Sequence, residues 1–201
     1  MKRLSETRKA ALILAAIAMV EGTWVLVNLL VNPRGFLRYV GFLNESPEPL
    51  GWVLSILVFV GFTAFARRLP SVRTTFLALS GLKLVALAVA IAAGLCEEAI
   101  FRKLLMDTLA RHEFSILLQV VGSALAFGLM HGIWGAFRGS LAAAVGATLA
   151  TGALGLALAL VYIASNRLLA PCIVAHFLIN ALAEPGLVLA AVRGEMGARR
   201  G

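Results

Sequence analysis

The chain is poor in charged residues, which make up only 14% of its 201 positions, whereas hydrophobic residues make up 61% and the mean hydropathy is +0.94. This composition excludes an ordinary soluble domain and indicates an integral membrane protein. Cysteine is also scarce: Cys96 and Cys172 lie inside apolar runs and form no CxxC pair. A structural zinc site is therefore not expected, and we interpret both cysteines as small buried hydrophobic residues.

Alternating strand patterns of about ten residues are absent, so a β-barrel is not favoured. A bilayer core about 30 Å thick needs roughly 20 apolar residues for each helical crossing, and the chain offers six such runs. We predict an all-α fold, a polytopic transmembrane helical bundle of about six spans (six to eight possible), with residues 1–201 forming a single integral membrane domain. The spans are expected near residues 10–32, 50–66, 74–95, 114–137, 140–164 and 168–192.

The net charge of +8 comes from basic residues near the expected ends of these spans. If the first apolar run is a retained helix and not a cleaved signal, six spans place most of these residues on one face. The positive-inside rule makes that face cytoplasmic, with both termini on it. Attraction to the lipid bilayer explains the charge, and no basic module with interleaved aromatics suggests a nucleic-acid partner. The residues concerned are Lys2, Arg3, Arg8, Lys9, Arg67, Arg68, Arg73, Arg193, Arg199 and Arg200.

The stretch CEEAIFRK places charges directly after an apolar run. Ionised side chains near mid-membrane cost about 2.5–3.5 kcal/mol each on insertion scales and usually face a cavity or a partner. On a helix, Glu98 and Arg102 are i,i+4 neighbours, whereas Glu97 points about 100° away. We therefore expect Glu98 to pair with Arg102 and Glu97 to be free to act as a base. Alternatively, the stretch is an interfacial loop of solvated charge, and the third span either ends near Glu97 or continues to about residue 109.

Two further polar motifs, FGLMH and HFLIN, interrupt later apolar runs. The first places Phe127 and His131 on one helix face, and the second does the same for His176 and Asn180. A lone membrane histidine is usually an interior hydrogen-bonding residue. One carboxylate, two histidines and an amide on three segments, however, supply a base, a proton shuttle and hydrogen-bond donors, a set that can hydrolyse an amide.

In this order, EEAIFR, FGLMH and HFLIN resemble the EExxxR, FxxxH and HxxxN motifs of the CPBP family, which comprises CAAX proteases and bacteriocin-processing (Abi-type) enzymes. The resemblance covers about residues 90–185 and implies an intramembrane endopeptidase that hydrolyses a peptide bond of a membrane-associated protein or peptide. By position it makes Glu97 the carboxylate that activates water and His131 its partner. His176 and Asn180 would stabilise the oxyanion. The supporting residues would be Glu98, Arg102 and Phe127.

The family is described both as metal-dependent and as glutamate-based, so we expect a metalloprotease or a glutamic protease. Glu97, His131 and His176 could supply the three ligands of a catalytic zinc site, which keeps a fourth position for water. We favour a mechanism with no metal and no other cofactor. HFLIN pairs His176 with Asn180, a good hydrogen-bond donor but a poor zinc ligand, and no HExxH motif is present.

Two other functions stay open. The chain could be a non-catalytic membrane immunity or scaffold protein that retains the fold, or a small transporter that uses the same buried charges. The intact motifs argue against loss of catalysis, and the absence of inverted repeats argues against a transporter.

Membrane depth raises a difficulty for a shared site. Straight helices over the expected spans would place His131 and His176 about 14 Å apart in depth. Tilted helices, shifted boundaries or a helix break could remove this separation. We nonetheless predict that Glu97, His131, His176 and Asn180 line one cavity.

Smaller features add three expectations. Gly128 and Gly132 form a GxxxG step, which permits close approach of two helices. Glu21 is expected to be paired within the bundle, with Lys83 as one candidate partner. Pro185 suggests that the last helix breaks at the membrane interface.

Overall fold

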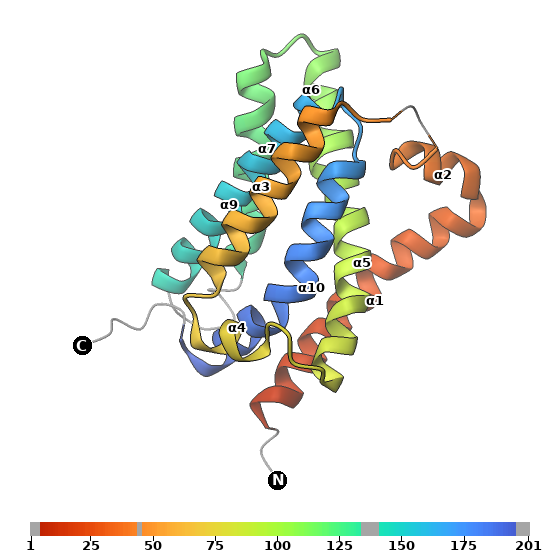
Figure 1. Cartoon of the computed structure of the whole chain (residues 1–201). Helices are drawn as coiled ribbons and strands as arrows, with labels where there is room; N and C mark the ends of the chain where they lie inside the picture. Colours follow the sequence, from red (N-terminus) through yellow and green to blue (C-terminus); the bar gives the residue numbers. More distant parts are fainter. Residues whose placement is uncertain (1–4, 44–45, 134–140, 196–201) are drawn as a thin grey trace.

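Residues 5–43, 46–133 and 141–195 are described by the computed structural model of the chain. These residues are mostly helical and contain no strand, so the predicted all-α fold is confirmed. Long helices run side by side in alternating directions, with shorter helices between them (Figure 1). The helices are α1 (Glu6–Val31), α2 (Pro33–Tyr39), α3 (Pro49–Ala66), α4 (Pro70–Thr75), α5 (Gly81–Glu98), η1 (Ala99–Met106), α6 (Asp107–Arg111), α7 (Ile116–His131), α9 (Leu141–Ala164) and α10 (Ala170–Arg193).

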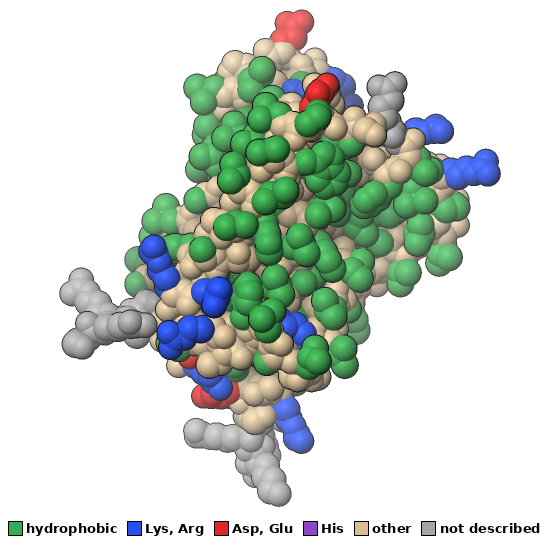
Figure 2. Space-filling model, in the orientation of Figure 1, with side chains coloured by type: hydrophobic (Ala, Val, Ile, Leu, Met, Phe, Trp, Pro, Cys, Tyr) green, Lys and Arg blue, Asp and Glu red, His purple; other side chains and the backbone are tan. Residues whose placement is uncertain are grey.

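Within the described ranges, five helical segments are long and apolar enough to cross a membrane. They are α1, α3, the continuous segment Gly81–Arg111, α9 and α10. The apolar helix α7 is shorter, with 16 residues, or about 24 Å at 1.5 Å per residue. Hydrophobic side chains cover the flank of the bundle and charged side chains lie toward its two ends (Figure 2). The chain is therefore a multi-pass membrane protein, as its composition predicts.

The third span differs from its expected position at both ends. Residues 74 and 75 belong to α4, and α5 begins only at Gly81, where the Ser80 hydroxyl accepts a hydrogen bond from the Lys83 amide (3.2 Å). A serine here satisfies an N–H that has no partner within the helix, which hydropathy alone does not reveal. At its other end the helix continues through CEEAIFRK as the π-helix η1. Glu97 therefore lies inside a span, and the alternative of a solvated loop is wrong.

Glycines let the helices that carry the polar motifs approach one another. A β-carbon added at Gly94 of α5 would lie 3.5 Å from the backbone nitrogen of Phe177 in α10. A β-carbon at Gly128 of α7 would lie 2.6 Å from the Thr148 carbonyl oxygen in α9, and one at Gly132 would lie 2.7 Å from the Thr148 hydroxyl. The predicted close approach at the GxxxG step is confirmed, and its partner helix is α9.

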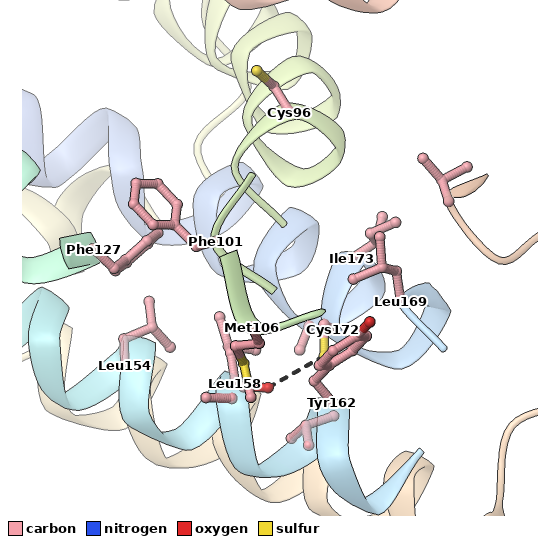
Figure 3. Close-up of a cluster of buried hydrophobic side chains, with 14 of the residues drawn as sticks. Cys96, Phe101, Met106, Phe127, Leu154, Leu158, Tyr162, Leu169, Cys172 and Ile173 are labelled. Carbon is pink, nitrogen blue, oxygen red and sulfur yellow. Dashed lines mark hydrogen bonds between the residues drawn. The ribbon is translucent and has the colours of Figure 1, made fainter. Parts of the chain in front are cut away.

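A hydrophobic core joins α5, η1, α7, α9 and α10 (Figure 3). Both cysteines are buried free thiols, as predicted. The Cys172 thiol donates a hydrogen bond to the Leu158 carbonyl oxygen (3.3 Å). The labelled core residues are Cys96, Phe101, Met106, Phe127, Leu154, Leu158, Tyr162, Leu169, Cys172 and Ile173.

Pro185 lies inside α10 and does not end it, so the expected helix break is wrong. A proline lacks the N–H that would bond the carbonyl four residues earlier, here that of Ala181. The Lys83 ammonium of α5 donates to this oxygen (2.9 Å) and to the Leu182 carbonyl (3.4 Å). It replaces the missing donor, which allows the helix to continue. Lys83 is therefore occupied by backbone oxygens and is not the partner of Glu21.

One end of the bundle is basic, as expected from the sequence. The start of α1, the end of α3, α4 and the end of α10 lie together there (Figure 1). Arg193 forms an ion pair with Glu6 (3.0 Å), and the Ser71 backbone N–H donates to the Glu195 carboxylate (3.2 Å). The described basic residues on these segments are Arg8, Lys9, Arg67, Arg68, Arg73 and Arg193; Lys2, Arg3, Arg199 and Arg200 lie outside the described residues.

Candidate active site

Three helices bring the predicted residues together. Glu97 lies near the end of α5, His131 is the last residue of α7, and His176 lies in the first half of α10. The Glu97 Oε2 atom is 3.7 Å from His176 Nε2 and 4.0 Å from His131 Nε2. The predicted convergence of these three side chains is confirmed, and the expected separation of the two histidines in depth is wrong.

The expected separation assumed that α7 and α10 begin at the same level. The turn between α6 and α7 projects beyond the end of the bundle where α10 begins (Figure 1). His131, at the far end of α7, therefore lies at the same level as His176, which is near the start of α10. The contact between Gly94 and Phe177 then holds α10 against α5 at this level.

Glu98 and Arg102 form the ion pair that the sequence predicts. Glu98 Oε2 is 3.1 Å from Arg102 Nε, and both side chains are fully buried. The two atoms are close but not aligned as a linear hydrogen bond. The Arg102 guanidinium also lies 4.6 Å from the centre of the Phe127 ring, a cation–π contact, and donates to the Gly155 carbonyl (3.4 Å). These contacts neutralise and enclose the arginine. The Glu98 carboxylate therefore has a structural role, whereas the Glu97 carboxylate is not held by Arg102.

Glu98 has a second contact that the sequence does not reveal. Its other carboxylate oxygen, Oε1, is 2.7 Å from His176 Nδ1. A carboxylate can only accept, so Nδ1 carries a proton. His131 is held in the same way, because its Nδ1 lies 2.9 Å from the Phe127 carbonyl oxygen. In the neutral form of each imidazole, the Nε2 atom that faces Glu97 is therefore the unprotonated nitrogen.

Phe127 lies between the two histidines. Its ring centre is 4.6 Å from that of His131 and 5.8 Å from that of His176, and Phe101 packs edge-on against it at 5.2 Å. Aromatic contacts of this kind fix ring orientation as well as position. The first residue of the FxxxH motif thus supports both imidazoles and Arg102.

Asn180 lies one helical turn after His176 on α10 and is half-buried. Its side-chain amide makes no hydrogen bond to any residue that the structure describes. The amide is therefore available to a bound molecule. A contact between Asn180 and the substrate stays a prediction.

A metal site would draw on Glu97, His131 and His176, whose donor atoms are of the types that zinc binds. Across the described ranges, however, no group of three or more His, Cys, Asp or Glu side chains is arranged to hold a metal ion. The residues present match the chemistry of a zinc site, and the choice between a metal-free and a zinc-dependent mechanism stays a prediction.

Fold and site together define a multi-pass membrane protein with a buried carboxylate, a buried histidine (His176) and a half-buried histidine (His131) between its helices. The model of one protein family, type II CAAX prenyl endopeptidase Rce1-like, matches residues 79–182, which is more than half of the chain. The protein therefore belongs to this family of proteases, and the resemblance seen in the three motifs is confirmed. All the site residues predicted from the sequence lie within the matched range. No curated protein and no solved structure matched the chain.

Proposed function

We propose that the protein is an intramembrane endopeptidase that cleaves a peptide bond of a membrane-associated protein or peptide. The observation that carries this proposal is the position of Glu97, whose carboxylate faces the Nε2 atoms of His131 and His176. The neighbouring Glu98 is held by Arg102, so only one of the two carboxylates is available for chemistry. Membership of a protease family supports the same reaction.

Glu97 acts as the general base. The 4.0 Å between Glu97 and His131 is too long for a direct hydrogen bond but suits a bridging water. This water loses a proton to the Glu97 carboxylate while its oxygen attacks the carbonyl carbon of the substrate. When the tetrahedral intermediate collapses, the C–N bond breaks and the proton passes to the leaving nitrogen. The products are one carboxylic acid and one amine, so the reaction needs no other reactant.

His176 and Asn180 stabilise the oxyanion of the tetrahedral intermediate. Asn180 donates through its amide. His176 points Nε2 toward the site, so it can donate there only as an imidazolium, with both nitrogens protonated. The contact of Glu98 with Nδ1 stabilises that charged form. Before the attack, the charges of Glu97 and Glu98 offset those of Arg102 and His176, and once Glu97 has taken the proton, the oxyanion carries the second negative charge.

The family name suggests a substrate that ends in a CAAX sequence and carries a prenyl group. The basic end of the bundle, which holds the start of α1 and the end of α10, faces the cytoplasm under the positive-inside rule. Both termini are then cytoplasmic, and the protein meets its substrate at the cell membrane.

The test is a cleavage assay with the purified protein in lipid vesicles. Two fluorescence-quenched CAAX peptides of the same sequence serve as probes, one farnesylated and one not. Glu97→Gln is expected to lower hydrolysis by about 100-fold or more and to leave the melting temperature unchanged. Glu113→Gln, the same change at an exposed position, is the matched control and should hydrolyse normally. Full activity of Glu97→Gln would contradict the mechanism, and no hydrolysis of either peptide by the unaltered protein would favour a non-catalytic role.

A further inference from the structure

The face of α7 that meets the candidate base carries three residues spaced four apart, Ser123, Phe127 and His131. Each of them contacts the helical segment that carries Glu97. The Ser123 hydroxyl donates a hydrogen bond to the Phe101 carbonyl oxygen in η1 (2.9 Å), and the Phe101 ring packs edge-on against Phe127 (5.2 Å). At the end of the row, His131 Nε2 is 4.0 Å from Glu97 Oε2. Ser123 therefore lies two helical turns from His131, on the face that forms the site.

The Ser123 hydroxyl makes a contact between two helices. A serine inside a helix often returns its hydroxyl to the carbonyl four residues earlier, as Ser165 does with Val161 (2.7 Å). Ser123 instead donates to Phe101, and its side chain is fully buried. Among the residues that the structure describes, this is the one hydrogen bond that joins α7 to α5 or η1. It is therefore the most directional contact between the helix of His131 and the helix of Glu97.

The other contacts of α7 fix its level against Glu97 less closely. Gly128 and Gly132 hold α7 against α9, which carries none of the site residues. Aromatic pairs are favourable over ring-centre distances of about 4.5–7 Å, so the contact between Phe101 and Phe127 tolerates sliding. A hydrogen bond from a hydroxyl to an oxygen extends only over about 2.5–3.0 Å. The Ser123 hydrogen bond therefore permits a much smaller shift of α7 along η1 than the aromatic contact does.

We propose that Ser123 is a positioning residue that sets the level of His131 against Glu97, a role that rests on the proposed hydrolysis. One water can bridge the 4.0 Å between the two side chains. A displacement of about 1 Å in an active site can cost about 100-fold in rate. Ser123 acts through α7 and does not touch the substrate, since its side chain is fully buried. It lies within the range that the family model matches but outside the three motifs.

Two serine-to-alanine variants separate positioning from structure. Ser123→Ala removes the hydrogen bond between helices, whereas Ser165→Ala, the matched control, removes an equally buried hydroxyl that bonds four residues back. We expect Ser123→Ala to lower kcat by about tenfold or more with KM within about twofold, because the catalytic side chains are kept but misplaced. Ser165→Ala should keep kcat within about twofold. Both melting temperatures should fall by about 3 °C or less, since single hydrogen bonds inside membrane proteins contribute little to stability.

A second readout needs no hydrolysis. Nitrogen-15 NMR of protein labelled at its three histidines reports the ring nitrogens, and the variant His131→Gln assigns the His131 signals. The Nε2 signal of His131 should move in Ser123→Ala, because Nε2 faces Glu97. The same signal should stay in place in Ser165→Ala.

The outcomes that overturn the proposal are specific. Normal kcat in Ser123→Ala, an equal loss in Ser165→Ala, or a loss confined to KM would each show that the hydrogen bond does not position His131. A much larger fall in melting temperature in Ser123→Ala than in Ser165→Ala would make the hydroxyl a purely structural group. An unmoved Nε2 signal would show that α7 keeps its level without the hydrogen bond. Inactivity of the unaltered protein would instead refute the proposed function, and the NMR comparison would still test the role of Ser123.

Discussion

Replacing Glu98 by glutamine weakens both of its contacts, those with Arg102 and His176, because the amide keeps the shape of the side chain but loses the charge. Arg102, which is fully buried, then lies in the interior without a counter-ion. Breaking a buried ion pair by removing one partner costs about 3–5 kcal/mol. For a chain of this length, 3 kcal/mol corresponds to a fall of about 6–12 °C in melting temperature. Hydrolysis should fall as well, since the His176 imidazolium loses the carboxylate at Nδ1.

The double variant Glu98→Gln, Arg102→Met separates the two effects. Methionine removes the unpaired charge and keeps an unbranched side chain against Phe127, so at least half of the lost thermal stability should return. Hydrolysis should not return, because His176 still lacks its carboxylate. Thermal unfolding followed by tryptophan fluorescence and the peptide cleavage assay measure the two quantities on one sample. A normal melting temperature in the single variant, or recovery of hydrolysis in the double variant, would refute this account of Glu98.

Three further predictions concern the oxyanion, the metal and the helix packing. Asn180→Ala should lower turnover by about 10² to 10³ with little change in KM; normal turnover with a lower melting temperature would instead mark Asn180 as a packing residue. Hydrolysis should survive strong chelation, because Glu97 activates water directly; loss of activity that added zinc restores would identify a metalloprotease. Gly128→Ala should lower the free energy of unfolding by about 1–3 kcal/mol, since its β-carbon would meet the Thr148 carbonyl at 2.6 Å. Gly146→Ala on α9, where nothing lies within 4 Å of the added carbon, is the matched control and should be neutral or stabilising.

The features that could be predicted from the sequence are those that depend on helical periodicity. The Glu98–Arg102 pair and the GxxxG contact follow from residues four apart on one face, and both are present. The different directions of the Glu97 and Glu98 side chains follow from the same helical geometry. The motif resemblance added that His131 and His176 belong to one site, which local spacing alone could not show.

Contacts between distant segments could not be predicted in this way. The Glu98–His176 hydrogen bond joins residues 78 positions apart, and no local pattern links them. The depth of each helix along the bundle could not be predicted either. The projecting α6–α7 turn sets the depth of His131, and hydropathy does not report it. The π-helical turns of η1 are likewise invisible to a pattern of apolar residues.

The contact between Lys83 and the carbonyl freed by Pro185 makes two positions depend on each other across about a hundred residues of sequence. A chain that replaced Lys83 first would be left with an unbonded carbonyl and a weakened helix between Asn180 and the end of α10. A chain that replaced Pro185 first would regain a backbone donor, after which the lysine would be dispensable. Among related sequences, the proline should therefore be the first of the two to disappear, and a proline at this position without a lysine opposite should be rare.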